Sequence, residues 1–165
     1  MQIMSKSPQD RTTILLRLAL GVALAYAGSL VNVPIVVTTL ALDSLPGFCY
    51  ALLFSGGEGA VVAAVGHLIT AALRGFPYGI PVHIGIMLGM ALAAWLLGVI
   101  AAKSKQWLGM LAALVVNGLL LPAALIPLLG VPFFAVSVLP LTVAAAINLV
   151  LAAAIARVLS VAIRN

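Results

Sequence analysis

Residues 82–102, VHIGIMLGMALAAWLLGVIAA, form an unbroken apolar run without a formally charged side chain. A run of this length matches the roughly 20 residues that an α-helix needs to cross the hydrocarbon core of a bilayer. Lipid offers no water to backbone N–H and C=O groups, and a helix satisfies these groups within one segment. The stretch therefore predicts a transmembrane helix.

The rest of the chain has the same character. Hydrophobic residues make up 65% of its 165 positions, and Asp, Glu, Lys and Arg only 7%. A soluble domain devotes about a quarter of its residues to these four types. So few charges cannot cover a water-facing surface, which excludes a soluble domain, and the apolar composition also excludes a disordered chain. The single cysteine, Cys49, excludes a disulfide scaffold.

We predict an all-α integral membrane protein with one domain over residues 1–165 and six transmembrane helices. The expected spans are 14–30, 45–54, 60–73, 82–102, 108–129 and 138–162. The second and third are short, so a five-span fold with a re-entrant hairpin there is the alternative. The segments 31–44, 74–83 and 130–137 are expected to be loops on one side. The basic start could be a signal peptide, but no polar mature domain follows it.

The basic residues predict the orientation. With six spans, seven of them fall on one side of the membrane and only Arg74 on the other. Lys and Arg accumulate on the cytoplasmic side of membrane proteins. Both termini are therefore expected in the cytoplasm. The seven residues are Lys6, Arg11, Arg17, Lys103, Lys105, Arg157 and Arg164.

Motifs for enzymatic chemistry are missing. The turn at residues 56–59, GGEG, lacks the Lys and Ser/Thr of a nucleotide-binding P-loop, and neither H-E-x-x-H, C-x-x-C nor G-x-S-x-G occurs. We expect neither an enzyme nor a resident metal or cofactor. The net charge of +5 is interpreted as membrane anchoring, not nucleic-acid binding.

Polar residues within an apolar chain indicate a binding site. An ionisable side chain inside a span costs about 2.5–3.5 kcal/mol on insertion scales, so it usually faces protein or a cavity. Small-molecule sites combine aromatic surfaces with a few convergent polar groups. On this basis we predict a ligand site in the outer half of the bundle. Its candidate residues are Asn32, Asp43, His67, Arg74, Tyr78, His83, Asn117, Phe133 and Asn148.

Six of these candidates also have a structural interpretation. Asn117 and Asn148 are more often interhelical hydrogen-bonding groups than ligand contacts. Asp43 precedes a helix start and is equally compatible with capping. Arg74 could pair with Asp43, His67 could serve packing, and Phe133 could anchor the membrane interface.

Ala19, Ala23 and Ala27 recur every four residues on the first predicted helix, beside a second row of Gly21 and Ala25. Small residues at this spacing let another helix approach closely in lipid. The alternative is packing inside the bundle.

These features together resemble the substrate-binding S component of energy-coupling factor (ECF) vitamin transporters. The similarity covers the size, the six spans and the missing ATPase motif. Locally it lies in residues 42–79, LDSLPGFCYALLFSGGEGAVVAAVGHLITAALRGFPYG, and in an A-x-x-x-A pattern at Ala19, Ala23 and Ala27.

The resemblance implies partners. In this family the A-x-x-x-A motif contacts a transmembrane coupling protein, which joins two ATPase subunits whose ATP hydrolysis drives uptake. The S component tips over in the prokaryotic cytoplasmic membrane. The 42–79 block is most similar to members assigned to α-ribazole, a nucleoside precursor of cobalamin. Cobalamin, riboflavin, pyridoxine and thiamine stay open as alternative ligands. Two other functions also stay open: a proton-coupled carrier that uses His67 and Asp43, and a scaffold subunit without a ligand.

Overall fold

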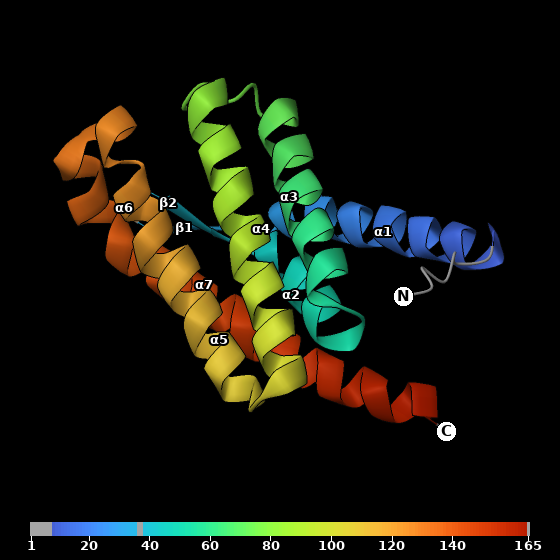
Figure 1. The fold of residues 1–165 in the computed structure, drawn as a ribbon. Helices are drawn as coiled ribbons and strands as arrows, with labels where there is room; N and C mark the ends of the chain where they lie inside the picture. The colour runs from blue at the N-terminus through green and yellow to red at the C-terminus, as the bar shows by residue number, and fades with distance from the viewer. Residues whose placement is uncertain (1–7, 36–37, 165) are drawn as a thin grey trace, which may run out of the picture.

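The structure is a computed structural model that describes residues 8–35 and 38–164, with side chains for 10–31 and 41–161. Helices build nearly all of it, and one β-hairpin lies beside them (Figure 1). The elements, in chain order, are α1 (Pro8–Ser29), β1 (Asn32–Ile35), β2 (Thr38–Ala41), α2 (Ser44–Leu53), α3 (Gly56–Leu73), α4 (Ile80–Lys103), α5 (Gln106–Val115), η1 (Val116–Leu120), α6 (Leu121–Ala124) and α7 (Ile126–Arg164).

The described helices are those of a multi-pass membrane protein. Five segments are long and apolar enough to cross a bilayer: 10–29, 56–73, 80–103, 106–124 and 126–161. They confirm five of the six predicted spans. The remaining one corresponds to α2, whose 10 residues reach about 15 Å. This is half the thickness of the hydrocarbon core, so α2 is too short to cross alone.

Two predicted boundaries were wrong. Residues 130–137 were expected to be a loop, but only Gly130 leaves the helical conformation, with φ 80°, and α7 continues beyond it. Glycine adopts this positive φ without strain, and Pro132 then fits the first turn of the continuing helix. The third predicted helix begins at Gly56 instead of residue 60, because the Ser55 side chain caps it by accepting the Glu58 N–H at 3.1 Å.

The predicted loop 31–44 contains a β-hairpin. β1 and β2 pair antiparallel, with Asn32 opposite Ala41 and Ile35 opposite Thr38. The Leu42 N–H donates to the Gly28 carbonyl near the end of α1 at 3.1 Å, which fastens the hairpin exit to that helix. β2 also lies against α7. The hairpin thus joins two helices that are far apart in the sequence.

Basic residues gather at one end of the bundle. Lys103 ends α4 and Lys105 precedes α5. Arg157 lines a groove with Leu53 and Gln106 at this same end. Arg74 follows α3, near the opposite end of α4, which is 24 residues long and so spans about 36 Å. Within the described residues, Arg74 and these cations therefore lie at opposite ends of the bundle. Lys6 lies outside the described residues.

The buried core lies between the helices and reaches the cavity at Met90. α2, α3, α4, α5 and α7 contribute to it, with Phe48 and Leu97 among its fully buried side chains. Small residues bring these helices into backbone contact. An added Cβ at Gly98 would lie 2.5 Å from Gly56 Cα and 2.8 Å from the Ala51 carbonyl oxygen. Backbone atoms cannot move aside as a side chain can, so glycine is required there.

Replacing Gly98 with alanine tests this close approach. We expect Gly98→Ala to destabilise the protein by about 1–3 kcal/mol, because α2, α3 and α4 must separate to admit the methyl group. The midpoint of thermal unfolding in detergent measures the effect. Gly57→Ala is the matched control, since a Cβ there meets only Ser55 Oγ, at 3.8 Å. Equal midpoints for the two variants would contradict the packing argument.

Candidate functional site

A cavity of about 510 Å³ lies in the half of the bundle nearer to Arg74. This volume falls within the range of about 300–1,000 Å³ that is typical of small-molecule sites. Its walls come from the hairpin exit, the start of α2, the end of α3, the start of α4, the η1–α6 segment and α7. Apolar side chains such as Val82, Met90 and Leu125 supply much of the lining.

The cavity gathers most of the predicted ligand-binding residues. Those that line it are Asp43, His67, Arg74, Tyr78, His83, Asn117, Phe133 and Asn148. Asn32 lies at the start of β1, and its side chain lies outside the part of the chain whose side chains the structure describes. The residues come from α3, α4, η1, α7, the α3–α4 loop and the residue before α2, so only the fold brings them together. Their role in binding stays a prediction.

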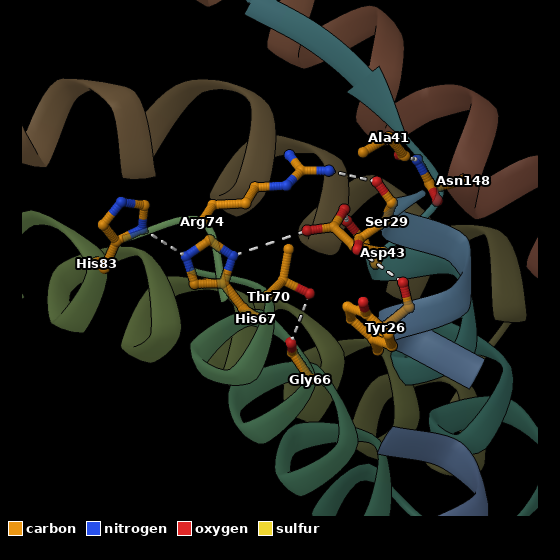
Figure 2. A network of polar contacts seen from close by, with 11 residues as sticks. Tyr26, Ser29, Ala41, Asp43, Gly66, His67, Thr70, Arg74, His83 and Asn148 are labelled. Atoms are coloured by element: carbon orange, nitrogen blue, oxygen red, sulfur yellow. Dashed lines mark hydrogen bonds and ion pairs between the residues drawn. The ribbon is translucent and has the colours of Figure 1, made fainter. Parts of the chain in front are cut away.

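Three titratable side chains form a row along one wall, as Figure 2 shows. Asp43 Oδ2 lies 3.7 Å from His67 Nδ1, and His67 Nε2 lies 3.2 Å from His83 Nδ1. Asp43 occupies the N-cap position of α2 but makes no side-chain capping hydrogen bond. Its other oxygen, Oδ1, accepts the Ser44 hydroxyl at 3.3 Å. The geometry therefore directs the Asp43 carboxylate toward the histidines and not toward the helix end.

Arg74 and Asn148 tie the rim of the cavity to neighbouring helices. The Arg74 guanidinium donates to the Ser29 carbonyl in the last turn of α1, and no ion pair joins it to Asp43 among the described residues. The positive charge of Arg74 also interacts favourably with the negative, C-terminal end of the α1 dipole. Asn148 Nδ2 donates to the carbonyls of Ala41 at 3.0 Å and Ala144 at 2.9 Å, which ties β2 to α7. Figure 2 shows both contacts around the hairpin exit.

Aromatic rings stand beside the histidine pair. The His83 ring has its centroid 5.7 Å from that of Phe76 and 6.1 Å from that of Tyr78. Tyr78 in turn lies 5.7 Å from Phe133 in an edge-to-face arrangement. Tyr78 is 46% exposed, whereas His83 is 5% exposed. The rings therefore separate His83 from the surroundings and offer flat apolar faces to a ring-shaped guest.

Asn117 reaches the cavity from a π-helical turn, η1, that sequence reasoning missed. Pro122 has no N–H to donate to the Gly118 carbonyl, four residues before it. The Thr142 hydroxyl lies 3.0 Å from that carbonyl and 2.7 Å from the Val138 carbonyl, so α7 supplies the missing donor. π-helical turns are frequent at functional sites. The only sequence signal was a proline five residues after an intramembrane asparagine.

The Thr142 hydroxyl is expected to stabilise this turn. Thr142→Val removes the donor at nearly constant volume and leaves the Gly118 carbonyl unsatisfied. We expect a loss of about 1 kcal/mol in the free energy of unfolding, the size typical of such hydrogen bonds. Unfolding by denaturant in detergent measures it. Thr142→Ser keeps the hydroxyl and serves as the control. If Thr142→Val is as stable as the unchanged protein, the hydroxyl does not stabilise the turn.

The small-residue rows of α1 face opposite ways. Gly21 and Ala25 are buried, and a Cβ on Gly66 of α3 would lie 2.5 Å from Ala25 Cβ. Ala19, Ala23 and Ala27 are exposed on the other face. Within the described chain, α1 packs mainly against α2 and α3, and Figure 1 shows it projecting from the bundle. The predicted contact stripe is therefore available to another protein.

An ion pair fixes α1 at the end far from the cavity. Arg17 Nη2 lies 3.0 Å from Glu58 Oε1, and its guanidinium lies 4.3 Å above the Phe54 ring. The Tyr50 hydroxyl donates to the Arg17 carbonyl at 2.8 Å. Sequence reasoning interpreted Arg17 only as a marker of orientation. These contacts with α2 and α3 set the rotation of α1 and hence the direction of its alanine face.

Among the described residues, no group of three or more His, Cys, Asp and Glu side chains is placed to hold a metal ion. Cys49 Sγ lies 3.8 Å from the Ala152 carbonyl oxygen inside the core, away from the cavity. Comparison of the chain with protein families, curated proteins and solved structures gave no match. The functional argument therefore rests on the site itself.

Proposed function

We propose that this protein is the substrate-binding membrane subunit of an ECF-type ABC importer. It captures a small aromatic vitamin or precursor, with α-ribazole as the best candidate, and delivers it inward with energy from partner ATPases. The cavity carries this proposal, because it joins an aromatic wall to a few polar groups within a membrane bundle. Its volume of about 510 Å³ suits a nucleoside-sized ring compound better than the much larger corrinoid of intact cobalamin.

The proposed orientation places the cavity toward the outside of a prokaryotic cytoplasmic membrane. The end with Lys103, Lys105 and Arg157 then faces the cytoplasm, as the positive-inside rule favours. Both termini are cytoplasmic in this arrangement if α2 and the hairpin before it together make the sixth crossing, from Asp43 at the cavity to Leu53 beside Arg157. Binding favours a closed cavity only through contacts that are better in the closed state. The aromatic side chains and the hairpin exit are placed to make such contacts.

Transport needs partners, because the chain contains no P-loop. The exposed face with Ala19, Ala23 and Ala27 supports docking of a transmembrane coupling protein, since small residues allow two helices to approach closely in lipid. In the proposal this coupling protein carries two ATPase subunits. The ATP is bound and hydrolysed by those subunits and not by this chain.

Ligand binding by the isolated protein tests the proposal. Calorimetry in detergent, without ATP, against α-ribazole, cobalamin, riboflavin, thiamine and pyridoxine should show saturable binding of one compound. Asp43→Ala should weaken that binding by at least about tenfold, because it removes the carboxylate that faces His67 and orients the two histidines of the cavity wall. Leu88→Ala is the control, because Leu88 is 59% exposed and lies outside the cavity lining. Absence of heat with the whole panel would contradict the assignment.

Coupling is tested separately by filling the alanine face. Ala23→Trp should abolish co-purification with the coupling protein and stop uptake, because the indole prevents close helix approach. Ligand binding by the isolated variant should survive. Leu88→Trp places the same bulk on an exposed position of α4 and should assemble normally. If Ala23→Trp assembles normally or instead loses ligand binding, the exposed stripe is not the coupling surface.

A proton-coupled carrier is the second candidate, favoured by the row of Asp43, His67 and His83 in the cavity wall. Buried ionisable side chains at membrane depth are typical of proton relays. Reconstitution separates the two functions. A carrier accumulates substrate in vesicles along a proton gradient without partners, whereas an ECF subunit moves none until the coupling protein, the ATPases and ATP are present.

A further inference from the structure

Three residues that line the cavity carry a buried hydrogen-bonding atom without a hydrogen-bond partner. One of these atoms, His67 Nδ1, lies 3.7 Å from the Asp43 carboxylate, which leaves two. His83 Nε2 and Asn148 Oδ1 find no hydrogen bond among the described residues. Both belong to residues that line the cavity, and the residues themselves are 5% and 1% exposed. An unsatisfied buried polar atom costs about 1–3 kcal/mol, so native structures rarely keep one without a reason. Whether each atom is a donor or an acceptor indicates which hydrogen-bonding group a ligand must supply.

The hydrogen bonds of Asn148 determine which way its amide points. Nδ2 donates to two carbonyl oxygens, those of Ala41 and Ala144. A flipped amide would set Oδ1 against both carbonyls, acceptor against acceptor, so the orientation is fixed. The unpartnered atom of Asn148 is therefore an acceptor.

Asp43 determines, through His67, which ring nitrogen of His83 carries the proton. The Asp43 carboxylate lies 3.7 Å from His67 Nδ1 and favours a proton on that nitrogen over a lone pair. In neutral His67 the other nitrogen, Nε2, is then an acceptor. The contact of 3.2 Å between His67 Nε2 and His83 Nδ1 requires His83 to donate from Nδ1. In neutral His83 this leaves Nε2 without a proton, as a second acceptor.

Neighbouring donors are already used. The Ser44 hydroxyl donates to Asp43, the Thr70 hydroxyl to the Gly66 carbonyl at 3.0 Å, and Arg74 to the Ser29 carbonyl. Asn117 and Tyr78 also line the cavity, but neither hydrogen-bonds His83 Nε2 or Asn148 Oδ1. In the described protein no donor therefore lies within hydrogen-bonding reach of either acceptor.

We infer that the cavity takes an aromatic molecule that donates at least two hydrogen bonds, one to His83 Nε2 and one to Asn148 Oδ1. This inference rests on the proposed function. Vicinal hydroxyls on a sugar attached to a ring system have this chemistry. Asp43 and His67 are positioning residues, because they fix which nitrogen of His83 bears the proton. A ligand whose polar edge carries only acceptors or anionic groups leaves both wall atoms unpaired and is rejected.

The first test needs no ligand and no substitution. Nitrogen NMR of protein labelled at histidine, in detergent at neutral pH, distinguishes the two neutral tautomers of each ring. We expect His83 to carry its proton on Nδ1 and His67 to carry its own on Nδ1. Asp43→Leu removes the carboxylate and should increase the fraction of His83 protonated at Nε2. A predominant Nε2–H tautomer of His83 in the unchanged protein would overturn the inference.

The second test measures donor recognition by calorimetry. The probes are α-ribazole and its dideoxy analogue, which lacks the two ring hydroxyls of the ribose. We expect the analogue to bind the unchanged protein about 10- to 100-fold more weakly, since it leaves buried acceptors unpaired. His83→Phe keeps a ring but removes the acceptor. In this variant the difference between the probes should shrink, which is the signature of a direct pair in a double-mutant cycle.

The outcomes separate this inference from the proposed function. If both probes bind the unchanged protein with equal affinity, water satisfies the wall atoms and the inference fails while the receptor function stands. If α-ribazole is preferred but His83→Phe leaves the preference unchanged, the assignment of His83 fails. If neither probe binds but another compound of the vitamin panel does, the receptor function stands. The inference then requires that compound to carry two hydrogen-bond donors and is overturned if it does not. Absence of binding throughout overturns both.

Discussion

The architecture depends on how closely helices can approach where glycine and alanine replace larger side chains. In the half of the bundle away from Arg74, Gly98 of α4 touches the backbone of α2 and α3 at Ala51 and Gly56. In the cavity half the pattern changes. A Cβ on Gly85 or Gly89 of α4 would meet the side chains of Leu125 and Leu121, at 3.2 and 2.5 Å, and not a backbone. A leucine side chain therefore separates α4 from the η1–α6 region there, and the space beyond it becomes the cavity. α4 is thus held by backbone contact in one half of the bundle and is spaced by leucine side chains in the half that contains the cavity.

Within that open half, the few polar groups have two separate tasks. Arg74 and the Nδ2 atom of Asn148 satisfy backbone carbonyls and hold the hairpin and α1 in place. His83 Nε2 and Asn148 Oδ1 satisfy nothing in the described protein. A single side chain, Asn148, thus joins structure to recognition, because the bonds of its amide nitrogen decide the direction of its oxygen. Asn148 can therefore connect two helices, as intramembrane asparagines generally do, and also contact a ligand, as predicted.

Sequence reasoning predicted the membrane class and five of the spanning helices. Eight of its nine candidate ligand residues line the cavity, and their role in binding stays a prediction. Sequence reasoning succeeded because apolar runs and rare polar residues are strong signals in lipid. It failed where tertiary contacts decide local structure. The hairpin in 31–44 depends on pairing and on the Gly28 and Asn148 contacts, and η1 depends on a donor from Thr142, 24 positions beyond Gly118. The Gly130 bend was mistaken for a loop because glycine and proline signal a turn without revealing how soon a helix resumes.

The β-hairpin also fixes a depth scale for the whole protein. In a two-stranded ladder, each strand points about half of its N–H and C=O groups away from its partner. Hydrocarbon cannot form hydrogen bonds with these groups. β1 and β2 must therefore sit level with the headgroups or within reach of water. Since the Leu42 amide bonds the Gly28 carbonyl, the last turn of α1 is held at that same level. The end of the bundle that contains the cavity consequently lies at the level of the membrane surface and not beneath the acyl chains.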